Sequence, residues 1–145
     1  MVHALSEARR ALRPGGRLID LRPTMRNRRV ELDLAGATLF LGEIDSSCTF
    51  SDHVAANASL DAALAAGDIR LEHKTAFAYV TDLDSLADLR EFEAGFRRSV
   101  MPESIYEQIR LLTADETEDF LIRVRREIMI ARYRRMPDTV LTESQ

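Results

Sequence analysis

Apolar and polar positions in the first part of the chain follow two different periods. Over residues 2–12, apolar side chains recur three to four positions apart, which predicts an amphipathic helix. The sequence Pro14-Gly15-Gly16 predicts the end of this helix, because proline cannot continue it and glycine adopts the left-handed exit. The short and largely apolar run 17–22 then predicts a strand that is covered on both faces.

The rest of the chain shows the same two periods. Alternation of apolar and polar residues predicts three more strands, at 30–34, 38–41 and 69–81, the first two forming a hairpin. Helical spacing predicts three more helices, at 51–66, 84–96 and 102–112. Asp84 is the expected N-cap of the second of these. The segment 120–134 fits a strand or a helix, and we favour a strand because β-branched residues dominate its apolar positions.

These elements predict one α+β domain over residues 1–136, with a mixed, mostly antiparallel sheet flanked by helices. Residues 137–145 are predicted to form a disordered tail. With 46% hydrophobic and 30% charged residues, the 145-residue chain has the balance of a soluble globular domain. The net charge of −4 argues against nucleic acid as a partner, and no apolar run is long enough to cross a membrane. Cys48 is the single cysteine, which predicts a reducing, cytoplasmic location.

The run Leu12-Arg13-Pro14-Gly15-Gly16, set between a helix and a buried strand, carries a family resemblance. It resembles the middle of a class I S-adenosylmethionine-dependent methyltransferase, where such a turn leads into a late strand of the parallel sheet. The later order of helix, strand, two helices and strand is similar to the C-terminal half of that α/β fold. In the family the cofactor-binding half comes before this point. Met1 lies close to the motif, so the resemblance implies that this half is missing.

The resemblance implies no cofactor site in this chain. The family binds its cofactor at a glycine-rich turn after the first strand and at an acidic residue that ends the next strand. The six glycines form no such cluster, so we assign no cofactor-binding residue and expect no cofactor for the isolated chain. S-adenosylmethionine is expected only where a complementary half is present. The three histidines lack the spacing of a metal site, and no catalytic residue is assigned.

Four residues are candidates for binding a ligand. Arg22 and Arg26 lie just past the carboxyl end of the strand at 17–22, where ligands of open α/β sheets bind, and guanidinium groups suit a small carboxylate or phosphate. His73 and Tyr79 share the apolar face of the strand at 69–81. The structural alternatives are a solvated loop with surface ion pairs for the arginines and a partly buried core position for His73.

Three functions follow from these observations. The leading hypothesis is a binding or interaction module that is non-catalytic on its own and forms a homodimer, because the strand at 17–22 would otherwise have an unpaired edge. The alternative is a part or subunit of a methyltransferase whose cofactor half is on another polypeptide, a partner protein, or was lost by truncation. The third is a small cofactor-free enzyme with a pocket near His73 and Tyr79.

Overall fold

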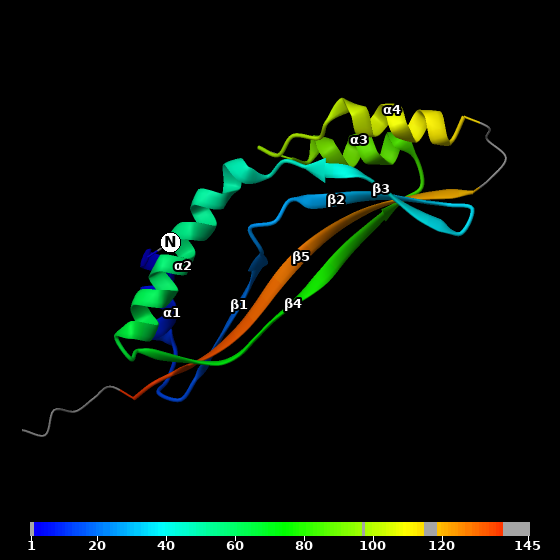
Figure 1. The fold of residues 1–145 in the computed structure, drawn as a ribbon. Helices are drawn as coiled ribbons and strands as arrows, with labels where there is room; N and C mark the ends of the chain where they lie inside the picture. The colour runs from blue at the N-terminus through cyan, green and yellow to red at the C-terminus, as the bar shows by residue number, and fades with distance from the viewer. Residues whose placement is uncertain (1, 97, 115–118, 138–145) are drawn as a thin grey trace, which may run out of the picture. The chain divides into compact units, whose positions relative to one another are not determined.

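The computed structural model describes residues 2–96, 98–114 and 119–137 and has an α+β fold with a five-stranded, mostly antiparallel sheet. The elements are α1 (Val2–Ala11), β1 (Arg17–Pro23), β2 (Arg28–Leu34), β3 (Ala37–Ile44), α2 (Phe50–Ala65), β4 (Ile69–Leu83), α3 (Leu86–Ala94), α4 (Glu103–Leu112) and β5 (Phe120–Arg135), as Figure 1 shows. A 3₁₀ turn at Ser47–Thr49 leads into α2. The strand order is β1-β5-β2-β3, and β4 also pairs with β5.

The helices and strands expected from the sequence are present, and the segment at 120–134 is a strand, β5. One detail of the prediction is wrong. Ser85, not Asp84, is the N-cap of α3, because its extended backbone lets its Oγ accept a hydrogen bond from the Asp88 N–H at 3.1 Å. Of the predicted tail at 137–145, only Pro137 lies within the described residues.

The hairpin of β2 and β3 closes through two residues with positive φ, Ala35 at 51° and Gly36 at 77°. This left-handed pair matches the right-handed twist of the flanking strands. The hairpin carries an irregularity in register between Val30 and Glu31, close to Gly42. A Cβ on Gly42 would lie 3.3 Å from the side chain of Ile105 on α4, so a larger residue there would press on the core.

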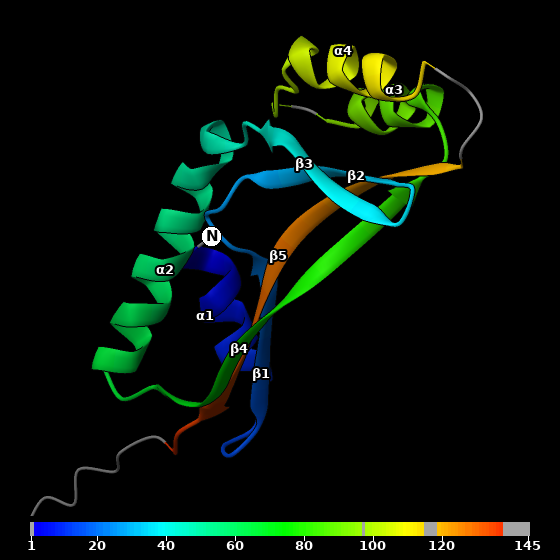
Figure 2. The same ribbon diagram turned by 45° about the vertical axis from the view of Figure 1, so that its right-hand side comes forward.

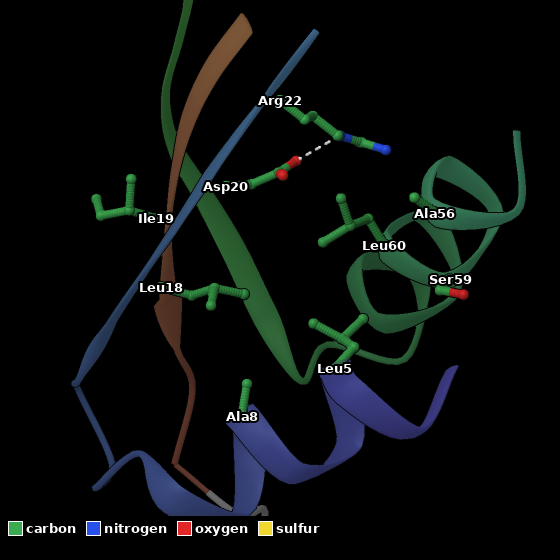
Figure 3. A pocket seen from close by; sticks show the side chains of 9 residues that line it. All are labelled: Leu5, Ala8, Leu18, Ile19, Asp20, Arg22, Ala56, Ser59 and Leu60. Atoms are coloured by element: carbon green, nitrogen blue, oxygen red, sulfur yellow. Dashed lines mark hydrogen bonds and ion pairs between the residues drawn. The ribbon is translucent and has the colours of Figure 1, made fainter. Parts of the chain in front are cut away.

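The contacts of the chain divide into two compact units. Unit 1 comprises residues 1–22, 51–76 and 129–145, and thus α1, α2, most of β1 and one part each of β4 and β5. Its buried core is Leu60, Ile69, Ala131 and Tyr133, with Leu5, Leu18, Ala63 and Leu64 packed against it. In this unit α1 and α2 lie on the same face of β1 (Figures 2 and 3). The burial of apolar side chains between these helices and the strands holds the unit together.

On the face of unit 1 opposite α1 and α2, one carboxylate forms ion pairs that link three strands. Glu72 of β4 accepts hydrogen bonds or ion pairs from Arg17 of β1 at 3.2 Å, from Arg132 of β5 at 3.0 Å and from Arg134 of β5. The hydrogen bond from Arg134, and to a smaller degree that from Arg17, lowers the pKa of this carboxyl below its ordinary value. The charged cluster therefore aligns β1, β5 and β4 where no buried apolar residues lie.

Unit 2 comprises residues 23–50 and 77–128 and has the larger core. Its buried residues come from β2, β3, β5, α3, α4 and the segment before α4: Val30, Leu32, Leu41, Ile44, Leu89, Met101, Ile105, Tyr106, Ile109, Ile122 and Val124. β2 pairs antiparallel with β3 and with β5, so every second residue of these strands faces the two helices. The opposite face is charged and is centred on Glu31, which is 6% exposed.

Candidate functional site

β1 forms the end of the sheet, and within the described residues it pairs only with β5. The carbonyl of Gly16 accepts a hydrogen bond from the Arg135 N–H at 2.8 Å, and the Thr24 N–H also donates to β5. Successive residues of a strand turn their backbone groups to opposite sides, so the even-numbered positions of β1 face β5. The odd-numbered positions, including Ile19 and Leu21, therefore direct their backbone groups to an unpaired edge.

The side chains of these two residues also lie in the solvent. Ile19 is 53% exposed and Leu21 is 59% exposed, so the two side chains form an adjacent apolar pair on the outer face of β1. Figure 3 shows the Ile19 side chain pointing away from α1 and α2. β1 thus combines a free backbone edge with an uncovered apolar face.

The helix-facing side of β1 borders a small cavity of about 210 Å³ (Figure 3). Its lining is mainly apolar, with three polar side chains, and consists of Leu5, Ala8, Leu18, Ile19, Asp20, Arg22, Ala56, Ser59 and Leu60. A dry cavity of roughly 150 Å³ is enough for benzene, so a small apolar group fits this space. The cavity lies wholly within unit 1.

Arg22 lies at the polar side of this cavity, but its guanidinium group is already engaged. Its Nε donates to Asp20 at 3.0 Å, one Nη donates to the Asn57 amide oxygen at 2.7 Å, and the other Nη donates to the His53 carbonyl at 3.4 Å. Both members of the Arg22–Asp20 ion pair are largely buried. Because the charge of Arg22 is balanced by Asp20, this side of the cavity presents a neutral polar pair.

The other three predicted residues do not line the cavity. Arg26 is 76% exposed and forms a surface ion pair with Glu127 at 3.3 Å. His73 and Tyr79 are both exposed on β4, His73 in unit 1 and Tyr79 in unit 2. Of the four predicted ligand residues, Arg22 is thus the one that lines this cavity.

Sequence reasoning missed the residues that surround Arg22. Asn57 and Ser59 lie within α2, where the helical spacing of the apolar residues predicts a helix but does not show which polar side chains face β1. Asp20 lies two positions before Arg22 on the same strand, and this spacing does place both side chains on one face. That period-two relation was the available signal for the ion pair.

Comparison with protein-family models, with curated proteins and with solved structures finds no match to this chain. No described helix has the length and apolarity to span a membrane. In the same described ranges, no three His, Cys, Asp or Glu side chains gather as they would around a metal ion.

Proposed function

We propose that this chain is a non-catalytic interaction module that forms a homodimer through the free edge of β1. The observation that supports it is the exposure of Ile19 and Leu21 on a strand whose outward backbone groups have no partner strand in the described residues. Such an edge is a template for pairing, and proteins usually cover it or protect it with charge. In unit 1 the β4 strand has that protection from Arg70, Glu72 and Lys74, whereas the middle of β1 has apolar side chains.

A second copy fits this edge because the β1 sequence is compatible with pairing to itself. An antiparallel two-fold pair centred on Ile19 places this residue opposite Ile19 of the partner subunit and Arg17 opposite the partner's Leu21. All of these positions turn their backbone groups outward, so each can exchange hydrogen bonds. A register centred on Asp20 would instead place two carboxylates opposite each other. Pro23, which has no N–H to donate, falls outside the paired segment.

Replacing Leu21 by lysine tests this interface. We expect the wild-type chain to have the mass of a dimer at micromolar concentration and Leu21→Lys to have the mass of a monomer, because a charge at the paired edge opposes association. Sedimentation velocity measures both masses. Leu111→Lys is the matched control: Leu111 is 78% exposed on α4 in unit 2 and is not part of the β1 edge, so its replacement leaves the dimer intact. A wild-type chain that is monomeric at high concentration would contradict the proposal, as would a dimer that persists in Leu21→Lys.

The second candidate is a component of an S-adenosylmethionine-dependent methyltransferase. The order of elements favours it: α1 precedes β1, α2 follows the inserted β2–β3 hairpin and leads into β4, and β5 pairs with both β1 and β4. This agrees with the helix, late strand, helix and closing pair of strands that the sequence resemblance implies. In that case the edge of β1 would receive a strand from the half that carries the cofactor.

Calorimetric titration with S-adenosylhomocysteine separates the two candidates. We expect no detectable binding to the chain alone, because it has no glycine-rich turn that could approach the cofactor. Binding with a micromolar dissociation constant would contradict the non-catalytic proposal and favour the methyltransferase.

A further inference from the structure

Two arginines lie side by side in unit 2 without a carboxylate partner. The register that pairs Arg29 with Arg125 places Arg28 of β2 opposite Arg126 of β5, one position further along. Both side chains are partly buried, on the strand face that also carries the buried Val30. Within the described residues, neither guanidinium forms an ion pair with Asp or Glu. This absence contrasts with the opposite face, where every arginine of these two strands is paired.

The surroundings of Arg28 add further donors and hold its side chain in place. Its guanidinium carbon lies 4.4 Å from the centre of the Phe96 ring, and its Nη1 donates to the Ser99 Oγ at 3.3 Å. The Ser99 Oγ lies 3.1 Å from the Oγ of Ser46, which is 2% exposed. Arg126 has no hydrogen bond to a described residue. The guanidinium groups of Arg28 and Arg126 and the Ser99 hydroxyl therefore offer many hydrogen-bond donors, and few protein acceptors lie near them.

A pair of like charges in this position is unfavourable without a counter-ion. Burial, and after it the charge of Arg126, lowers the pKa of Arg28 to about 10, and burial lowers the pKa of Arg126 as well. An anion held between the two groups would remove the repulsion and restore the lost hydrogen bonds.

We propose that Arg28 and Arg126, with Ser99, form a binding site for a phosphate group. Two planar forks and a hydroxyl direct donors from several sides, which suits the three terminal oxygens of a phosphate monoester better than the two of a carboxylate. The site lies within unit 2 and does not involve the edge of β1, so it is independent of the proposed homodimer.

Thermal unfolding in the presence of inorganic phosphate at constant ionic strength tests this site. We expect a saturable rise in Tm over chloride buffer, a smaller rise with acetate, and at least about a tenfold weaker response to phosphate in Arg126→Met. In chloride buffer Arg126→Met should have a higher Tm than wild type, because the repulsion of Arg28 is gone. A merely structural role for Arg126 would lower this Tm instead.

Arg110→Met is the matched control, because Arg110 is an exposed arginine on α4 with a long ion pair to Glu103. We expect it to respond to phosphate like wild type. Arg28→Met is a second variant that removes the other fork and should also weaken the phosphate response. The proposal would be overturned by an equal Tm in phosphate and chloride, by an equal effect of acetate, or by a full phosphate response in Arg126→Met.

Discussion

Replacing Tyr106 by alanine is expected to lower the free energy of unfolding by about 3–5 kcal/mol. Tyr106 has no solvent exposure and is the largest fully buried side chain among the described residues of unit 2. Its hydroxyl donates to Glu93 at 2.7 Å, and the guanidinium carbon of Arg90 lies 3.4 Å from the centre of its ring. Alanine would leave a cavity in the core beside α3 and would remove both contacts with that helix. Urea denaturation of the two proteins measures the difference.

Tyr106→Phe separates the hydroxyl from the ring. We expect it to cost about 1 kcal/mol, because it removes one hydrogen bond to a partly exposed carboxylate and keeps the packing. Tyr79→Phe is the matched control, since Tyr79 is 59% exposed, and it should leave the free energy of unfolding unchanged. A loss in Tyr106→Ala no larger than that in Tyr106→Phe would contradict the packing role of the ring.

The raised pKa of Tyr106 predicts that the free energy of unfolding falls at high pH. Burial, and then the hydrogen bond to Glu93, raises the pKa of Tyr106 from 10.0 to about 12. The unfolded chain releases this proton first, so the contribution of Tyr106 is complete below pH 10 and is lost as pH rises from 10 to 12. Denaturation curves at pH 9 and pH 11 measure this change in the free energy of unfolding. We expect it to be smaller in Tyr106→Phe than in wild type. An identical pH dependence in the two proteins would contradict this assignment.

Replacing Arg125 by methionine is expected to lower the free energy of unfolding by about 2–3 kcal/mol. Arg125 donates from Nε and Nη2 to the buried carboxylate of Glu31, at 3.3 and 3.2 Å. Two cationic neighbours remain, Arg29 at 3.8 Å and Arg123 opposite Glu31 on β5, but Arg123 is already paired with Asp33 and Asp82, so the buried charge is compensated only in part. Methionine keeps the apolar stem of the side chain, and the loss therefore reports the charge.

Two further variants test that interpretation. Arg110→Met removes an exposed arginine from a surface pair and should change the free energy of unfolding by less than about 0.5 kcal/mol. Replacing Glu31 by leucine in the Arg125→Met protein should recover most of the loss, because no unpaired charge is then buried. If the double variant is as unstable as Arg125→Met, the unpaired carboxylate is not the cause.

The secondary structure could be predicted from the sequence because most of its elements have a clear period. β5 is the instructive case: its apolar residues alternate, arginines interrupt the pattern, and its β-branched residues still indicated a strand correctly. The N-cap of α3 could not be chosen with certainty from the sequence. Asp84 and Ser85 are neighbours and both are good capping residues, and only the extended backbone of Ser85 decides between them.

The candidate sites were predictable only in part because they depend on strand register. Period-two alternation predicts that Arg22 shares a face with Asp20, but the approach of Asn57 from α2 requires the packing of a helix on that face. Similarly, Arg28 and Arg126 are 98 positions apart in the sequence, and only the pairing of β2 with β5 brings them together. Long-range pairing is the information that a local pattern does not contain.

Disulfide trapping at Ile19 tests most directly whether the β1 edge pairs with a second copy. With Cys48 replaced by serine, Ile19→Cys provides the only thiol, and opposite residues of a hydrogen-bonded antiparallel pair have Cα atoms about 5.5 Å apart, within the range of a disulfide. We expect mild oxidation to convert this variant to a covalent dimer, while Leu111→Cys in the same background stays monomeric on a denaturing gel. An Ile19→Cys protein that yields no more covalent dimer than Leu111→Cys would contradict pairing through β1.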